Sequence, residues 1–512
     1  MNYVPKMNRR SFIIASAAAG GGLAVGVPFG GNSSASAQAA PSTPELGAWV
    51  VVKPDDTVVI RVVRSEMGQG TLTGLCQLVA DELDCNWDKV TWEYPTPGQS
   101  VARKRVWGDF GTGGSRGIRT SHVYVRQGGA VAREMLKQAA ANEWKVPVGE
   151  LTVDKGVITH KASNRTTTYG KVADAAAKLD VPDPKSMKLK DPKEWKIVGK
   201  PVARLDTIDR VTGKQVYGTD VKLPGMLNAA IKDCPVFGGK LKSYDESKVS
   251  GMPGVKKVVR VGDSAVAVVA DTWWQAKTAL DALPIVWDEG ENAKVSSASI
   301  AAWLKEGLDA PEAFVGNDNG DAKAALASAA KKVEAVYSYP YQNHACMEPM
   351  NATALYTADK CEAWAPTQNG EAAFGAVVQA SGLPAGKCEV YKTHLGGGFG
   401  RRGRSDYVTQ AVLIAKQMPG TPVKLIWSRE EDMAHGTYHP VMQAKMVGGF
   451  DKDNNLTALH MRLSGQSILA SIFPGNLDKG DTNPKNKGMD PNTFQGLQRQ
   501  GQEHAFEHSN TS

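Results

Sequence analysis

Three glycine-bearing loops carry the residue types that bind anions. In the stretch THLGGGFGRR, residues 393–402, three consecutive glycines precede another glycine and two arginines. Glycine permits positive φ and close backbone approach, so successive N–H groups can face an anion at the start of a helix. Arg401 and Arg402 add guanidinium groups suited to bidentate phosphate contact. This loop is therefore a candidate phosphate cradle.

The same loop also fits a dinucleotide fingerprint. Gly398, Gly400 and Gly403 stand in G-x-G-x-x-G register after an expected strand at 388–395 and before an expected helix. Glu430, at the end of the next expected strand, could bind a ribose. The fingerprint usually opens the first βαβ unit of a domain, which is not its place here. Taken alone, the loop is consistent with a dinucleotide, another phosphate ligand or a structural turn.

Two further loops have the same composition. RSEMGQGTLTG, residues 64–74, places Gly70 beside Gln69, whose amide could grip a heterocycle or a phosphate. GDFGTGGSRGIR, residues 108–119, supplies a second set of donors before another expected helix: Thr112, Gly113, Gly114, Ser115 and Arg119. Each loop alone also fits an ordinary strand-to-helix turn. Together, three such loops predict one long anionic ligand.

A chain of 512 residues exceeds the size of a single hydrophobic core, so more than one domain is expected. Strands and helices of these domains must position the three loops. Alternating apolar residues predict a strand pair within 45–64, and helical spacing predicts helices at 71–83 and 125–143. The proline- and lysine-rich stretch 181–201 is expected to be a solvated crossing between domains.

Beyond that crossing, the pattern over 254–283 predicts two short strands and a helix. An Ala-rich helix is expected within 316–335. The third α/β unit then contains expected strands at 361–368, 388–395 and 421–430, with a helix at 405–418.

Composition excludes several classes of protein. Hydrophobic content of 42% and charged content of 22% are those of an ordinary globular protein, and the formal charge of +7 gives no nucleic-acid signature. The six cysteines form no C-x-x-C pair, so the sequence predicts no zinc or iron-sulfur site in this chain. If electrons move through the protein, another chain must hold the redox centres that pass them on.

The first residues resemble a twin-arginine export signal. Arg9 and Arg10 precede a glycine-rich apolar run, residues 12–27, which is too short for stable membrane insertion. The small residues Ala35 and Ala37 predict cleavage after residue 37. Removing the signal would lower the formal charge from +7 to +4. We therefore expect an exported, periplasmic protein that receives its cofactor before export.

Collinear stretches between about residues 45 and 475 resemble the xanthine oxidase family of molybdenum hydroxylases. The similar branch contains the large, or beta, molybdopterin-binding subunit of isoquinoline 1-oxidoreductase and related exported aldehyde dehydrogenases. The shared stretches are SEMGQGTLTGLCQLVADEL, GTGGSRGIRTSHVYVRQGGAVAREML, DVKLPGMLNAAI, AVAVVADTWWQAKTALDALPIVWDEG, PYQNHACMEPMNATA, WAPTQ, LGGGFGRR and VKLIWSREEDMAHGTYHP.

The resemblance implies an α+β fold, in which an aldehyde oxidase/xanthine dehydrogenase a/b hammerhead domain is inserted among α/β cofactor-binding units. The implied segments are a signal at 1–37, an N-terminal molybdopterin-binding segment at 45–180, the hammerhead domain at 200–291 and a molybdopterin-binding domain at 330–512. The cofactor implied is molybdopterin cytosine dinucleotide. Its expected contacts are Gln69, Gly70, Thr112, Gly113, Gly114, Ser115, Arg119, Gln342, Gly397, Gly398, Phe399, Gly400 and Arg401.

The implied chemistry is hydroxylation of an electron-poor carbon, in an N-heterocycle or an aldehyde, with water as the oxygen donor. The resemblance also implies a small partner subunit with [2Fe-2S] clusters, a c-type cytochrome as electron acceptor and a small-molecule substrate. No nucleic-acid partner is expected. The substrate itself cannot be read from the sequence.

The sequence departs from the family near its end. The Gly-Glu-Pro-Pro-like segment that supplies the family's catalytic glutamate does not occur, so no catalytic residue is named and the C-terminal part of the cofactor domain is expected to be missing. His344 and Glu348 have metal-ligand spacing, but Pro340 and Pro349 argue against a helix, so no protein metal ligand is predicted. A nicotinamide-dependent dehydrogenase and a non-catalytic remnant that binds the small subunit remain as alternatives.

Overall fold

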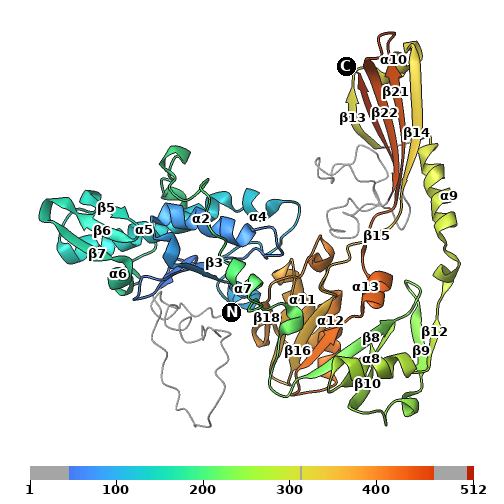
Figure 1. Ribbon diagram of the computed structural model, residues 1–512, viewed down its shortest axis with the longest axis horizontal. Helices are drawn as coiled ribbons and strands as arrows, with labels where there is room; N and C mark the ends of the chain where they lie inside the picture. Colours follow the sequence, from blue (N-terminus) through green and yellow to red (C-terminus); the bar gives the residue numbers. More distant parts are fainter. Residues whose placement is uncertain (1–44, 312–313, 466–503, 512) are drawn as a thin grey trace, which may run out of the picture. The chain divides into compact units, whose positions relative to one another are not determined.

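A computed structural model describes residues 45–311, 314–465 and 504–511 (Figure 1). The predicted signal at 1–37 lies outside the described residues. The chain divides into two compact units, each discontinuous in sequence. Unit 1 comprises residues up to 224 together with 351–398 and 402–422, and unit 2 comprises 225–350, 399–401 and the residues from 423. Helices and strands are mixed throughout both units.

Unit 1 begins with a four-stranded sheet packed on two helices. The strands are ordered β1 (Glu45–Leu46), β2 (Val50–Val52), β3 (Val58–Arg61) and β4 (Val90–Glu93), of which β3 and β4 are parallel. Helices α2 (Thr71–Leu83) and α5 (His122–Trp144) pack against each other and bury the apolar face of this sheet. The predicted strand pair and both predicted helices are therefore confirmed.

Two further groups of strands complete unit 1. One is antiparallel and consists of β5 (Leu151–Asp154), β6 (Val157–His160) and β7 (Arg165–Thr168), followed by α6 (Tyr169–Ala176). The other contains β16 (Asn351–Tyr356), β17 (Cys361–Ala365) and β18 (Cys388–Lys392), with β17 and β18 parallel. Helices α11 (Gly370–Ser381) and α12 (Asp406–Lys416) pack on this sheet. The three predicted elements at 361–368, 388–395 and 405–418 are confirmed.

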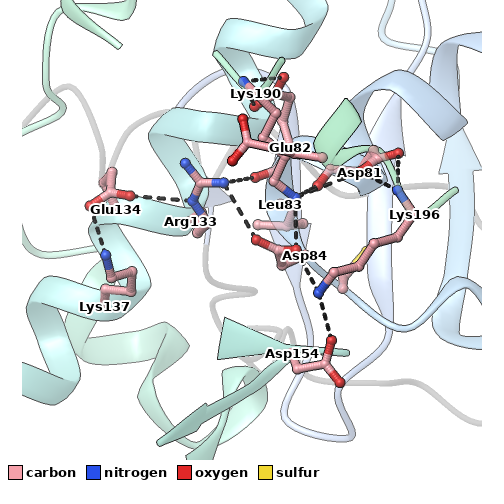
Figure 2. Close-up of polar contacts among 12 residues, drawn as sticks. Asp81, Glu82, Leu83, Asp84, Arg133, Glu134, Lys137, Asp154, Lys190 and Lys196 are labelled. Carbon is pink, nitrogen blue, oxygen red and sulfur yellow. Dashed lines mark hydrogen bonds and ion pairs between the residues drawn. The ribbon is translucent and has the colours of Figure 1, made fainter. Parts of the chain in front are cut away.

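The stretch 181–201 is not a freely solvated crossing. The carboxylate of Asp81, at the end of α2, accepts hydrogen bonds from the backbone N–H groups of Lys196, Ile197 and Val198 at 3.1, 2.9 and 2.8 Å. Lys190 lies on the same helix end, where its ammonium group pairs with Asp84 (Figure 2). Most residues of the stretch are exposed, as expected for a solvated segment, but buried carboxylates far away in the sequence also bind it.

Unit 2 contains a sheet of strands β10 (Val255–Val261), β11 (Ala265–Ala270), β8 (Leu227–Asp233) and β19 (Val423–Ile426). Helix α8 (Trp273–Ala282) packs on β8 and β11 and closes a small apolar core. The predicted strand–strand–helix pattern over 254–283 and the predicted strand within 421–430 are confirmed. Strands β9 (Lys240–Tyr244) and β12 (Ile285–Asp288) form a separate pair, and α13 (Arg429–His435) follows β19.

A five-stranded sheet forms the rest of unit 2. Its strands are ordered β13 (Phe314–Asn319), β23 (His504–Thr511), β22 (Leu456–Gly465), β21 (Met442–Phe450) and β14 (Lys331–Tyr339), with helices α9 (Ser297–Leu308) and α10 (Ala322–Ser328) against it (Figure 1). The expected Ala-rich helix ends at Ser328, and the residues after it form a strand instead. Alternation of Val333, Ala335 and Tyr337 favours the strand over the helix there.

None of the helices in the described ranges is both long and apolar enough to cross a membrane.

A candidate cofactor site built from three loops

The first glycine loop closes on a carboxylate of its own. Glu66, fully buried, accepts hydrogen bonds from the backbone N–H groups of Gly68, Gly70 and Leu72 at 2.8, 3.1 and 3.0 Å. Gly70 has a positive φ of 84° and precedes α2, so the loop has the geometry of an anion site at a helix N-terminus. In this protein the side chain of Glu66 provides the anion.

Gln69 also bonds within its own loop. Its amide nitrogen donates to the carbonyl of Ser65 at 2.9 Å, and its amide oxygen accepts from the N–H of Met67 at 2.8 Å. A ligand could therefore recruit Gln69 or the N–H of Gly70 only by replacing these internal bonds. Their role in ligand binding stays a prediction, and the geometry assigns the loop a second task, which is to place Ser65 and Met67.

The second loop is tied to the first through Thr112. The hydroxyl of Thr112 accepts a hydrogen bond from the N–H of Ser65 at 2.8 Å. Its own N–H donates to the carbonyl of Gln368 at 2.7 Å, and the amide nitrogen of Gln368 donates back to the Thr112 carbonyl at 2.9 Å. The Ser65 hydroxyl in turn donates to the carbonyl of Thr367 at 2.7 Å. Segments some 50 and 300 residues apart therefore meet through buried hydrogen bonds.

The rest of the second loop is open. Gly113, Gly114 and Ser115 are exposed, and the last two have left-handed φ values of 57° and 56°. Within the described residues, none of these three backbone N–H groups has a hydrogen-bond acceptor. Arg119, one turn further on, donates to the carbonyl of Gly114 at 3.2 Å and is itself exposed. Unbonded N–H groups next to a guanidinium group suit a phosphate or a pterin oxygen.

The third loop packs on the first two. A Cβ atom added to Gly398 would lie 2.6 Å from both the Gln368 amide oxygen and the Met67 sulfur, so any other residue there would require these side chains to move. The N–H of Leu395 donates to the carbonyl of Glu66 at 3.3 Å. The carbonyl of Gly397 accepts from the guanidinium group of Arg402 at 3.0 Å. The three loops of unit 1 thus converge around Gln368, a residue that the sequence did not single out.

Buried positive or neutral groups lie beneath the third loop. Lys392 is almost fully buried, donates to the carbonyl of Val63 and lies 4.3 Å from the ring centroid of Tyr94. Burial lowers the pKa of Lys392 to about 7. The ring of His394 lies tilted against the rings of Trp92 and Tyr94, and burial lowers the pKa of its imidazole to about 4, so it is neutral at neutral pH.

The remaining predicted residues belong to unit 2. Phe399 has a left-handed φ of 54° and an exposed side chain, and Gly400 follows with a φ of 106°. Arg401 is buried against the ring of Trp427 at 5.3 Å. Gln342, in the short strand β15 (Gln342–Asn343), accepts a hydrogen bond from the Tyr339 hydroxyl at 2.9 Å.

His344 lies beside this part of the loop. Its Nδ1–H is held by the carbonyl of Thr437 at 2.8 Å, and its ring stacks on His439 with centroids 4.4 Å apart. Its Nε2 atom would lie 3.6 Å from a Cβ added to Gly400. Burial, and then the neighbouring His439, lower the pKa of His344 to about 4. The residue therefore presents a neutral imidazole nitrogen towards the glycine loop. Spacing had suggested His344 only as a metal ligand, a role that the sequence argument rejects.

Two family models match the chain, and both are described as a molybdopterin cofactor-binding domain. One matches residues 6–212 and the other residues 308–467. The converging loops at Ser65, Thr112 and Gly398 fall within the two matched regions. The chain belongs to the molybdopterin-binding subunits of the xanthine oxidase family of oxidoreductases.

Curated relatives agree with this class. The chain is 28% identical to the beta subunit of isoquinoline 1-oxidoreductase from Brevundimonas diminuta, over 92% of this chain and 65% of the relative. It is 28% identical to the membrane-bound aldehyde dehydrogenase [pyrroloquinoline-quinone] of Gluconacetobacter polyoxogenes, over 93% of this chain and 62% of the relative. It is also 26% identical to a nicotinate dehydrogenase subunit from Pseudomonas putida, over 84% of this chain and 36% of the relative.

The chain thus spans less than two thirds of the length of these relatives. Among solved structures, quinoline 2-oxidoreductase from Pseudomonas putida 86 matches 51% of this chain and 38% of its own, with 22% identity and a TM-score of 0.41.

Proposed function

We propose that this chain is the large subunit of an exported molybdenum hydroxylase that oxidises an N-heterocycle or an aldehyde, with water as the oxygen donor. The observation that carries the proposal is the convergence of three glycine loops around Gln368 in unit 1. The printed names of the relatives, which act on isoquinoline, nicotinate or aldehydes, support the substrate class.

The donors present in unit 1 fit the tail of a molybdopterin cytosine dinucleotide. The unbonded N–H groups of Gly113, Gly114 and Ser115 would bind its diphosphate or pterin oxygens, and Arg119 would add a positive charge. Gly397 and Gly398 would let the backbone of the third loop approach the cofactor closely. When bound, the cofactor would accept the electron pair from the substrate.

The contacts that the resemblance implies for residues of unit 2 stay part of the proposal. Phe399, Gly400 and Arg401 would supply backbone and guanidinium donors, and Gln342 would donate a hydrogen bond to an oxygen of the cofactor. No residue is assigned as the catalytic base. We also propose the finer organisation that the resemblance implies, with the a/b hammerhead domain at 200–291 between cofactor-binding segments at 45–180 and 330–512.

Electron transfer would require a second chain. The sequence has no C-x-x-C pair, so we propose a small partner subunit with [2Fe-2S] clusters and a c-type cytochrome as the acceptor. The isoquinoline and nicotinate relatives are each named as one subunit of an enzyme, which supports a multi-subunit assembly. We propose the periplasm as its location, from the twin-arginine-like residues at the N-terminus.

A nicotinamide dinucleotide fits the geometry less well. In the dinucleotide fold the glycine turn joins a strand directly to a helix. Here residues 393–405 separate the end of β18 from the start of α12, and the third loop packs on two other loops instead of opening a βαβ unit.

The test is to purify the chain with its co-expressed small subunit and to measure bound molybdenum and cytidine monophosphate released by hydrolysis. We expect one of each per chain and dye reduction by an N-heterocycle or an aldehyde. Binding of a nicotinamide dinucleotide without molybdenum would overturn the proposal. If the chain binds the cofactor but does not oxidise any of these substrates, the alternative of a non-catalytic remnant that binds the small subunit would be favoured.

A further inference from the structure

Three side chains at one edge of the antiparallel sheet of β5, β6 and β7 form a hydrogen-bonded chain. Glu150 lies just before β5, His160 ends β6, and Ser163 lies in the turn between β6 and β7 (Figure 1). The register pairs Leu151 with His160 and so brings Glu150 to the same edge. His160 is buried, whereas Ser163 is exposed. The arrangement therefore joins a buried imidazole to a serine that a solute can reach.

The hydrogen bonds of this chain set the direction of proton transfer. The Nε2 atom of His160 lies 2.8 Å from a carboxylate oxygen of Glu150, and its Nδ1 atom lies 2.6 Å from Ser163 Oγ. Because a carboxylate only accepts hydrogen bonds, it places the ring proton on Nε2 and leaves Nδ1 as an acceptor. The Ser163 hydroxyl therefore donates to a histidine that a third group orients, which is the arrangement of an activated nucleophile.

Arg165, the first residue of β7, adds a positive charge beside the serine. Its Nε–H donates to Ser163 Oγ at 2.7 Å, and its Nη1 atom donates to the carbonyl of Trp144 at 3.2 Å. Within the part of the chain that the structure describes, its Nη2 atom donates to no acceptor. Nε and Nη2 form one edge of the planar guanidinium group, here called the fork, and such an edge binds two oxygens on one carbon. With Nε bonded to Ser163 Oγ, Nη2 can bind the second oxygen of an acyl group attached there.

We propose that Ser163 is a nucleophile that accepts the acyl group of small activated esters. Ser163 Oγ bonds to the carbonyl carbon, and its proton passes to Nδ1 of His160. The bond between that carbon and the leaving alcohol then breaks, and the alcohol takes the proton from His160. The fork of Arg165 binds the negative oxygen of the tetrahedral intermediate, and Glu150 balances the charge of the imidazolium. The products are an acylated Ser163 and a free alcohol, so the step needs no oxidant or reductant.

The exposure of the turn limits the class of acyl donor. Residues 161–164 are all exposed, so a long acyl chain would gain little from burial there. The best donors are therefore small esters with a good leaving group, which need little binding energy. Ser186 provides a matched serine in the same chain. It is also exposed, but its hydroxyl donates to the carbonyl of Asp183 at 2.7 Å and not to a histidine.

The test is to treat the purified full chain with p-nitrophenyl acetate and to follow acetylation of each serine by peptide mass spectrometry. We expect Ser163 to gain an acetyl group at least about 100-fold faster than Ser186, because only Ser163 has a general base. His160→Gln should lower the rate at Ser163 to that of Ser186. Acetylation of Ser163 no faster than that of Ser186, or an undiminished rate in His160→Gln, would overturn the proposal.

Two further variants decide the question if His160→Gln, at a buried position, fails to fold. Arg165→Lys keeps the positive charge but removes the fork, and it should slow acetylation of Ser163 at least about tenfold. Glu150→Gln should slow it as much, because an amide can donate to Nε2 and so move the ring proton to Nδ1.

Glu143→Gln, at an exposed position on α5, is the matched control and should leave the acetylation rate unchanged. Thermal unfolding followed by circular dichroism verifies that each variant is folded. Loss of reactivity in folded Arg165→Lys and Glu150→Gln would support an activated serine, since a purely structural hydrogen bond would not change the acetylation rate. An unchanged rate in either variant would also overturn the proposal.

Discussion

The carboxylate of Glu66 accepts a hydrogen bond from the backbone N–H of Leu72 at 3.0 Å, across the first turn of α2. The same carboxylate binds the N–H groups of Gly68 and Gly70 and lies 3.2 Å from the guanidinium group of Arg204. A bound anion would occupy this position in a phosphate-binding loop. The first loop is therefore held in place by its own carboxylate, and the cofactor contacts predicted for Gln69 and Gly70 stay predictions.

Replacing Glu66 with Gln should destabilise unit 1. The change removes a buried counter-charge from Arg204 and Arg210 and weakens three backbone hydrogen bonds, at a cost of about 2 to 4 kcal/mol. Glu93→Gln is the control, since Glu93 pairs with Arg61 but is 46% exposed, and it should cost less than about 1 kcal/mol. Urea unfolding followed by circular dichroism measures both. Equal costs would contradict the role given to Glu66.

Gly398→Ala should lower the cofactor content of the purified protein. The new Cβ would collide with the Gln368 amide oxygen and the Met67 sulfur, and so would separate the third loop from the other two. Gly403→Ala is the matched control, because nothing lies within 4 Å of a Cβ at that position. We expect molybdenum per chain to fall at least about tenfold for Gly398→Ala, a change of about 1.4 kcal/mol or more, and to stay unchanged for the control. Similar molybdenum content in the two variants would argue against the three-loop site.

Lys392 should make the free energy of unfolding of unit 1 depend on pH in the neutral to alkaline range. Burial lowers its pKa from 10.5 to about 7, so between these values the folded state binds fewer protons than the unfolded state. The free energy of unfolding should therefore rise with pH through this window, by up to about 1.4 kcal/mol per pH unit. Lys392→Met should remove that contribution, while Lys53→Met, at an exposed position, should keep it. Urea midpoints measured from pH 7 to 10 give the slopes, and parallel slopes for wild type and Lys392→Met would refute the assignment.

Asp81→Asn should release the segment that follows residue 181. The carboxylate holds three consecutive backbone N–H groups, and the neutral amide is a weaker acceptor that also leaves Lys190 with less counter-charge (Figure 2). Trypsin should then cleave after Lys193 or Lys196 at least about tenfold faster, which corresponds to about 1.4 kcal/mol of lost protection. Asp154→Asn removes only a partner of Lys196 that is 68% exposed, and it should change the rate little. Mass spectrometry of the fragments identifies the cleavage site and gives the cleavage rate of each variant.

Much of the fold could be predicted because its signals are local. The alternation before Arg61, the helical spacing of 71–83 and the glycines ahead of helices are read within a dozen residues, and the structure confirms those elements. The length of the Ala-rich helix was wrong, since alternating Val and Tyr residues after Ser328 make a strand and the helix stops there.

Other features depend on contacts between distant residues. An acidic side chain in a loop looks the same in sequence whether it is exposed or, like Glu66, holds that loop together. Gln368 becomes part of the site only because Thr112, 256 residues earlier, lies against it. Likewise, the lysines of 181–201 look solvated until Lys190 meets Asp84, 106 residues away. Periodicity carries no information on such pairings.

The buried acids at the end of α2 also decide where this protein can be joined to a relative. A hybrid with its junction near residue 185 would take Asp81 and Asp84 from one parent and their lysine partners from the other, and mismatched partners would leave carboxylates buried without cations. A junction at Pro224, where unit 1 first gives way to unit 2, keeps both sides of the contact in one parent. Gene shuffling within this family should therefore tolerate the later crossover far better than the earlier one.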